Sequence, residues 1–253
     1  MKDFSYQGKF WLGDRLATGR PGPLSWVGDA PTLSLKFSLD KSDRTESYSG
    51  NRATSASLRK ATKGTFDLTL NWALAKNLAL GLGGTVIDIP TGTVTGEPFP
   101  PGLAVGDTIM LAHRDVSALV LTDSTATPKT LVLDTDYEIE SAKGGLMTIK
   151  ALGTPTYTQP FKGAYSYGKS TNVVAFTTPA IEKYGVMDGI NTVDNSSVRV
   201  QVYRMQFDPV SEFGLIQDDF GDLKLSGSVL FDVVNASDDE FGGYMLTEFP
   251  ADD

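Results

Sequence analysis

The side chains that could do chemistry are few, and they stand far apart in the sequence. The single histidine, His113, is followed by Arg114 and Asp115 at the end of an expected strand. A general base needs an acid or a nucleophile held beside it, and no nucleophile motif accompanies this histidine. We therefore interpret His113 as an exposed turn residue.

Other candidate motifs are incomplete. Asp134 and Asp136 alternate as in a calcium loop, but the later ligands and the glycine of such a loop are missing. The chain has no cysteine, which excludes disulfides and thiolate metal sites. It has no Gly-x-Ser-x-Gly elbow, phosphate-binding loop or His-rich metal spacing either. We expect no enzymatic activity, no cofactor and no bound metal.

Composition narrows the class of protein further. The absence of cysteine fits a reducing compartment. A net charge of −9 and a pI of about 4.7 argue against a large nucleic-acid-binding surface. The polar N-terminus predicts no signal peptide, and no apolar run approaches bilayer length, so no membrane association is expected. Gly, Ser and Thr are abundant and the strongest periodicity is two, which predicts a mainly β protein.

The clearest structural signal lies at residues 196–234. Two long strand patterns, 197–207 and 222–233, are separated by breaks at Pro209 and Gly214, which predicts a long hairpin. Side chains alternate faces along a strand, so the second pattern has one apolar and one polar face. The apolar face holds Leu223, Leu225, Val229, Phe231 and Val233, and the polar face holds Lys224, Ser226, Ser228 and Asp232.

The first strand of this hairpin changes phase near Tyr203. Val198, Val200 and Val202 share one parity, and Tyr203, Met205 and Phe207 share the other. Such a shift predicts a β-bulge or a change of pairing partner.

The first third of the chain predicts strands at 4–12, 24–27, 31–40 and 65–72. Leucines repeat every four residues over 73–82 before a Gly-Gly pair, which predicts a short amphipathic helix. Between two of these strands, residues 41–63 are almost entirely polar. This segment is expected to be a long exposed loop or a protruding hairpin.

The middle of the chain predicts a separate module. Gly- and Pro-rich borders enclose short strands at sandwich-like spacing, at 108–112, 118–122, 129–133, 137–141, 146–150 and 161–167. Insertions of this kind are tolerated where their two ends lie close together. We therefore divide the chain into a first half at 1–90, an inserted β-sandwich-like domain at 91–168, and a second half at 169–253.

Charge is distributed unevenly along the sequence. Basic residues outnumber acidic ones before Gly64, whereas Lys224 is the only basic residue after Asp208. Opposite poles on one chain favour head-to-tail contacts between copies, which form rings or filaments. Ordinary surface charge that keeps the protein soluble is the alternative explanation.

Several segments resemble the tail tube (major tail) proteins of long-tailed bacteriophages. In the first third they are 4–13 (FSYQGKFWLG), 24–31 (LSWVGDAP), 46–52 (ESYSGNR) and 77–82 (NLALGL). The insert carries segments that look like modules common in such proteins, at 134–139, 145–149 and 164–168. The last third matches at 203–209 and 227–232. These are patterns of structural residues and contain no catalytic signature.

The resemblance implies an antiparallel β-sandwich or barrel with a short flanking helix and an inserted small β-sandwich on the exterior. Subunits of this kind form rings, usually hexameric, that stack into the tube through which the genome is ejected into the host. The implied partners are further copies of the chain, with tail terminator, tape measure and distal tail proteins. Viral DNA would pass without specific binding. The implied location is the virion tail, assembled in the host cytoplasm.

The resemblance also suggests two sets of functional residues. The polar strand face would line the lumen, through Lys224, Ser226, Ser228 and Asp232. The polar segment 41–63 would contact the next ring, through Arg44, Glu46, Arg52 and Arg59. An acidic balance would repel phosphates, so DNA could slide without sticking.

A virion decoration or adhesin protein is the alternative, with the inserted sandwich binding a host glycan. The aromatic residues of the insert are few, and most have parities that suit a core. They are Phe99, Tyr137, Tyr157, Phe161, Tyr165 and Tyr167.

Overall fold

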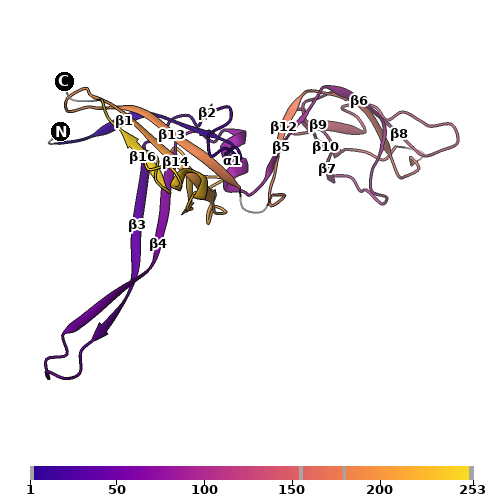
Figure 1. Cartoon of the computed structure of the whole chain (residues 1–253). Coiled ribbons are helices and arrows are strands. Elements are labelled where there is room, and N and C mark those ends of the chain that lie inside the picture. The colour runs from indigo at the N-terminus through magenta and orange to yellow at the C-terminus, as the bar shows by residue number, and fades with distance from the viewer. Residues whose placement is uncertain (1–2, 154–155, 179–180, 251–253) are drawn as a thin grey trace. The chain divides into compact units, whose positions relative to one another are not determined.

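The computed structural model describes residues 3–153, 156–178 and 181–250 (Figure 1). Strands make up 49% of the described residues and helices 5%, with antiparallel sheets, so the mainly β prediction is confirmed. The chain divides into two compact units. Unit 1 comprises residues 1–86 and 173–253, and unit 2 comprises residues 87–172. The sequence had suggested an insert at 91–168.

Unit 1 is built on one eight-stranded antiparallel sheet, in which seven strands follow the order β2-β1-β13-β14-β15-β4-β3. The strands from the first half are β1 (Tyr6–Gly13), β2 (Ser25–Trp26), β3 (Thr32–Thr45) and β4 (Thr54–Leu70). Those from the second half are β13 (Glu182–Asn191), β14 (Ser197–Phe207), β15 (Leu223–Val229) and β16 (Met245–Glu248), the last pairing with β14.

Two short helices complete unit 1, α1 (Ala75–Gly81) and α2 (Val233–Ala236). The first confirms the helix expected at 73–82. The buried Asn77 side chain ties α1 to the chain beyond β2, because its Nδ2 donates to the carbonyl of Val27 at 2.6 Å. Leu80 adds the apolar side of α1 to the core.

The core of unit 1 lies along the pairing of β4 with β15. Leu68 pairs with Leu225, and both are buried. Gly227 lies among the inward-facing residues of β15 and leaves room for the Phe66 ring. A Cβ atom at position 227 would lie only 2.8 Å from that ring. The Phe66 ring packs edge-on against Phe207 at 4.9 Å, so the missing side chain is part of the packing.

The long hairpin predicted at 196–234 forms only in part, since β14 and β15 are antiparallel neighbours that pair beside their connecting loop. β14 and β15 pair at only three positions, near Phe207. Most of β14 pairs with β13 and β16, and β15 pairs with β4 along its whole length. The alternation also ends early, because β15 stops at Val229, and Phe231 and Val233 are 48% and 72% exposed. The apolar pattern identified the buried face of each strand but did not encode which strand lies beside it.

The phase shift in β14 corresponds to an irregularity of pairing with β13. Lys183 pairs with Met205, whereas Gly185 pairs with Val202. Tyr203 and Arg204 therefore both stand opposite the single residue Tyr184. This confirms the predicted bulge, and the extra residue changes which parity faces the core.

Unit 2 contains two three-stranded antiparallel sheets, β7-β10-β9 and β6-β11-β8. Their strands are β6 (Gly92–Pro98), β7 (Thr108–Met110), β8 (Val116–Thr122), β9 (Tyr137–Ser141), β10 (Leu146–Ile149) and β11 (Lys162–Tyr167). Of the predicted strands, 129–133 forms only isolated bridges, although Leu131 is buried in the core. The sequence missed β6 because its glycine and proline content is typical of turns.

The chain passes between the units through β5 (Thr85–Ile89) and β12 (Ser170–Val174), which pair with each other. The Thr171 hydroxyl donates to the Asp88 carboxylate at 2.7 Å, so the two ends of the intervening segment lie side by side. Each of the two hydrophobic cores draws all of its members from one unit.

We expect unit 1 to fold without unit 2. Replacing residues 90–169 by a short Gly-Ser linker should retain the circular dichroism spectrum and cooperative thermal unfolding of unit 1, because its core loses no member. As a control, residues 87–172 expressed alone should also fold. An aggregated or unfolded product from the shortened chain would mean that unit 2 supplies part of the unit 1 core.

Candidate assembly surfaces

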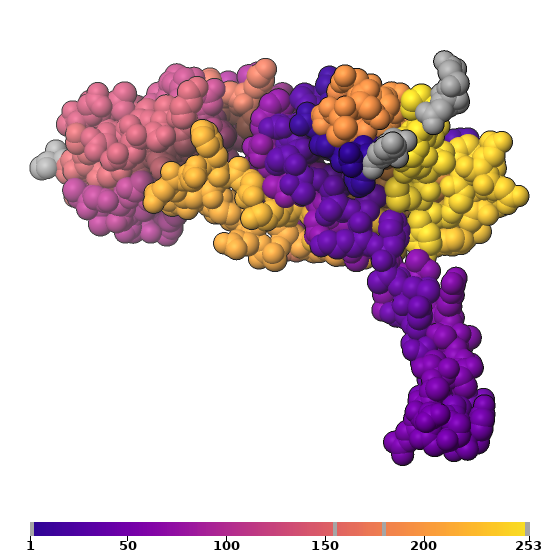
Figure 2. Space-filling model, turned by 90° about the vertical axis from the view of Figure 1, so that its left-hand side faces the viewer, coloured from indigo at the N-terminus to yellow at the C-terminus, as the bar shows by residue number. Residues whose placement is uncertain are grey.

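A projecting ribbon is the most unusual feature of unit 1. We call residues 38–63, which form the outer part of β3 and β4 and the turn between them, the hairpin arm (Figure 1, Figure 2). Every residue of the arm except Glu46 is exposed. A two-stranded ribbon exposed on both faces buries little surface and is marginal by itself.

The hairpin arm exposes apolar side chains to solvent. Leu58 is 65% exposed, Tyr48 is 89% exposed, and Leu39 is 36% exposed. Near the base of the arm, Phe37 is 45% exposed although its ring meets that of Tyr244 edge-on at 5.9 Å. These apolar side chains stand on a ribbon that has no core of its own to bury them.

Three of the four residues expected to contact a neighbouring ring lie on the surface of this arm. Arg44, Arg52 and Arg59 are exposed, and none forms an ion pair with another residue in the described part of the chain. The hairpin arm holds six basic and three acidic side chains, so it is positive on an acidic protein.

Glu46, the fourth residue, has a structural role instead. Its carboxylate accepts hydrogen bonds from the backbone amides of Tyr48 and Ser49 at 3.0 and 2.9 Å, and from the Ser49 hydroxyl. The Ser49 hydroxyl bond is the main reason that the pKa of Glu46 is lowered. These bonds supply the partners that a buried carboxylate needs. Through them Glu46 holds the turn at the tip of the arm closed.

A second surface is formed by the outward residues of three neighbouring strands. On β15, Lys224 and Ser226 are exposed and Ser228 is half-buried. The strand register sets these three opposite Thr69, Asp67 and Thr65 of β4. We define the polar sheet face by these six residues together with Ser34 and Lys36 of β3, which pair with Asp67 and Thr65. The alternation in the sequence indicated the outward parity of each strand but could not show that the strands are neighbours.

The polar sheet face is rich in hydroxyl groups and nearly balanced in charge. It contains two lysines and one aspartate, and Lys36 pairs with Asp67 at 2.6 Å. Both side chains are more than half exposed, so the pair contributes little to stability. The acidity of the chain therefore comes from other parts, chiefly the twelve carboxylates after position 207.

Asp232 does not belong to the polar sheet face, contrary to the sequence prediction. It is fully buried at the start of α2, where it accepts hydrogen bonds from the amides of Val234 and Asn235. The Arg15 guanidinium donates to both of its carboxylate oxygens at 2.7 Å. The Arg15 bond is the first cause of the lowered pKa of Asp232. The prediction failed because faces alternate only as far as the strand extends.

The residues first considered for chemistry have packing roles. His113 lies in a bend, as expected, but its side chain is half-buried and not exposed, because its ring lies parallel to that of Tyr167 with centroids 3.7 Å apart. Asp136 accepts hydrogen bonds from the Val132 amide at 2.7 Å and the Tyr157 hydroxyl at 2.8 Å. Within residues 3–153, 156–178 and 181–250, no group of three or more His, Cys, Asp or Glu side chains could hold a metal ion.

These features define a mainly antiparallel β protein whose distinctive surfaces are a projecting arm and a polar sheet face. The chain belongs to the family described as Protein of unknown function UCP028589, whose model matches residues 3–248. No curated protein matches the chain. The described residues contain no helix that is long and apolar enough to cross a bilayer.

Proposed function

We propose that the protein is a structural virion protein, a tail tube subunit whose copies form stacked rings, usually hexameric in such tails. The tube would conduct the genome into the host. The observation that carries the proposal is the hairpin arm, which is exposed on both faces and has no partner in its own copy over most of its length. A ribbon of this kind is stabilised once a neighbouring copy covers it.

The edge of the main sheet supports the same proposal. β3 is the last strand of the order, and β4 is its only strand partner along all 14 residues in the described part of the chain. A long open edge presents unpaired amides and carbonyls and invites pairing with another chain. Joining of edges between copies, as in a closed barrel, removes this liability.

The polar sheet face suits the lining of a DNA conduit. Each lysine or arginine that neutralises a phosphate adds salt-dependent affinity for nucleic acid. With two lysines, one aspartate and several hydroxyls, this face offers a wet surface and little net attraction. DNA would pass along it without specific binding.

The proposal assigns unit 2 to the outside of the tube. A duplex is about 20 Å wide, judged from its groove dimensions, and a lumen that passes it leaves no space for six further domains.

The other partners would be tail terminator, tape measure and distal tail proteins, and assembly would take place in the host cytoplasm before incorporation into the virion tail. The resemblance of the sequence to tail tube proteins is the basis for these partners.

The alternative of a glycan-binding adhesin or decoration protein gains no support from unit 2. Four of its six aromatic side chains, Phe99, Tyr137, Phe161 and Tyr165, are buried. Buried rings contribute to the core and cannot form a sugar-stacking platform.

Electron microscopy of the purified chain tests the tail tube proposal directly. Stacked rings or tubes would support it, and monodisperse monomers at every concentration would refute it.

We expect charge reversal on the hairpin arm to disrupt stacking. The Arg44→Glu/Arg52→Glu variant should keep the fold of unit 1, because both side chains are exposed. Its tubes should be shorter or absent, since the arm loses its positive charge. Negative-stain images and circular dichroism would separate assembly from folding. Lys129→Glu/Lys162→Glu in unit 2 is the matched control, and tubes of normal length from the arm variant would contradict this role.

A further inference from the structure

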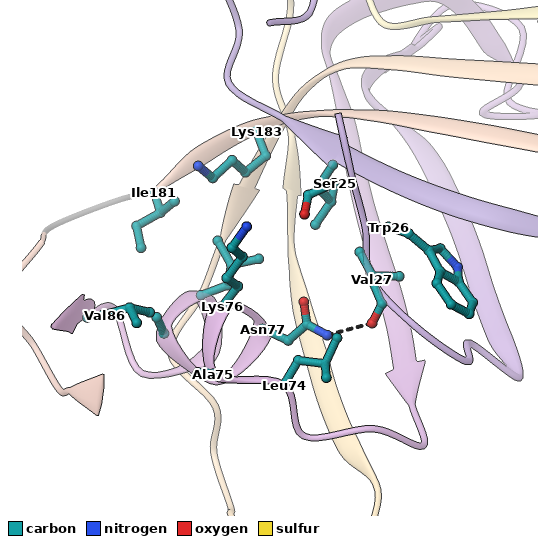
Figure 3. A pocket seen from close by; sticks show the side chains of 14 residues that line it. Ser25, Trp26, Val27, Leu74, Ala75, Lys76, Asn77, Val86, Ile181 and Lys183 are labelled. Carbon is teal, nitrogen blue, oxygen red and sulfur yellow. Dashed lines mark hydrogen bonds between the residues drawn. The ribbon is translucent and has the colours of Figure 1, made fainter. Parts of the chain in front are cut away.

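A pocket of about 560 Å³ opens beside α1 in unit 1 (Figure 3). Pockets of roughly 300–1,000 Å³ accept drug-sized molecules, so two branched aliphatic side chains fit this volume. Apolar residues make up most of its lining, including Trp26, Leu74, Leu80, Val86 and Ile181. Among the described residues that line it, only Lys76 and Lys183 are charged. Lys183 contacts Asp14, whereas Lys76 forms no ion pair within the described residues. The pocket is therefore apolar with an available positive charge.

The apolar character of the pocket continues onto the surface around it. Leu74 and Val86 are 42% and 37% exposed. Trp26 is also exposed, and its ring meets that of the exposed Trp72 edge-on at 5.3 Å. A contiguous exposed apolar surface around a pocket indicates a site for another protein surface.

The same unit exposes an apolar segment in the connection between β14 and β15. The base of this connection is anchored, because the Val210 amide donates to the carbonyl of Gly81 at 2.7 Å and Phe213 packs against the core. Beyond the base, Leu215, Ile216 and Phe220 are 82%, 98% and 101% exposed. We call residues 214–221 the loop tip.

We infer that the loop tip of one copy binds the α1 pocket of a second copy. Leu215 and Ile216 supply apolar side chains, and Asp218 and Asp219 supply negative charge to meet Lys76. The tip does not occupy the pocket of its own copy, as the exposure of Ile216 demonstrates. The opposite charges of the tip and of Lys76 favour a second copy as the occupant.

Loop tip and pocket are different surfaces, so this contact is heterologous and leaves one free tip and one free pocket in every pair. Such contacts propagate into closed rings or open filaments. The inference rests on the proposed function in that it names the contact through which the copies join. Its test nevertheless differs from the microscopy that tests tube formation.

The test uses two full-length variants with complementary defects. Ile216→Asp disables the tip and Val86→Asp disables the pocket, and each variant alone should self-associate roughly thirtyfold more weakly than the natural chain in sedimentation velocity. An equimolar mixture should recover association between differently labelled copies, because each pair retains one intact tip and one intact pocket. Val193→Asp, which removes a 57% exposed apolar side chain elsewhere in unit 1, is the matched control and should associate normally.

Should Val86→Asp fail to fold, Lys76→Glu replaces it, with Asp218→Lys/Asp219→Lys in the second copy to restore opposite charges. Unchanged association of Ile216→Asp would overturn the inference, and so would a mixture that does not recover. Tubes formed by Ile216→Asp would leave the tail tube proposal standing while this contact fails. Recovery in the mixture without rings or tubes from the natural chain would support the contact and refute the tail tube.

Discussion

Leu225→Asp should abolish the folding of unit 1, whereas Ser226→Asp, one residue further along β15, should leave it folded. Leu225 is 1% exposed and pairs with Leu68 inside the main core. A carboxylate there would be buried without a partner, which costs several times more than a surface charge. Ser226 is exposed and stands opposite Asp67, so the added like charge should cost less than about 1 kcal/mol.

Soluble yield, near-ultraviolet circular dichroism and thermal unfolding would measure this difference. Leu225→Ala provides a graded version, with an expected loss of about 2–5 kcal/mol in the free energy of unfolding. Phe231→Asp distinguishes the burial seen in the structure from the burial that the sequence pattern predicts. Phe231 shares the parity of Leu225 but is 48% exposed. It should be tolerated far better than Leu225→Asp. Equal losses from Leu225→Asp and Ser226→Asp would mean that the two faces of β15 are assigned wrongly.

Removing either partner of the Arg15–Asp232 pair should lower the free energy of unfolding by about 3–5 kcal/mol. Asp232 is fully buried, and Arg15 binds both of its oxygens at 2.7 Å. The loss follows because the remaining charge would lack its counter-ion. For unit 1 this corresponds to a fall in melting temperature on the order of 10 °C.

A set of variants separates the roles of Asp232. Asp232→Asn removes the charge but keeps an oxygen that can cap α2, whereas Asp232→Ala loses both. The alanine variant should therefore be the less stable by about 1 kcal/mol. Asp222→Asn is the matched control, since Asp222 contacts Lys224 at 3.3 Å on the surface and its loss should change little.

The same pair predicts a pH dependence. Since the pKa of Asp232 is lowered in the folded protein, chiefly by the hydrogen bond from Arg15, the folded chain binds this proton less tightly than the unfolded chain. Its stabilisation is present at neutral pH and is lost as the pH falls below about 4 toward the folded pKa. Asp232→Asn should show less of this acid destabilisation in denaturant titrations. Parallel stability curves for the variant and the natural chain would contradict the prediction.

The sequence by itself determined the properties that depend on neighbouring residues. The alternation around Leu225 identified the buried and wet faces of β15, the leucine spacing identified α1, and the phase change near Tyr203 identified the bulge. These predictions succeeded because side-chain direction in a strand or helix repeats with a fixed local period.

Only the tertiary structure decided which surfaces those elements form together. β15 pairs with β4, far away in sequence, so the polar sheet face includes Asp67 beside Ser226. Asp232 looked like a surface carboxylate until Arg15, 217 positions away, proved to be its partner. The loop tip around Ile216 likewise could not be recognised as exposed from its own apolar residues. Local patterns encode which side of an element faces a core, whereas the partner across it is selected by packing of the whole chain.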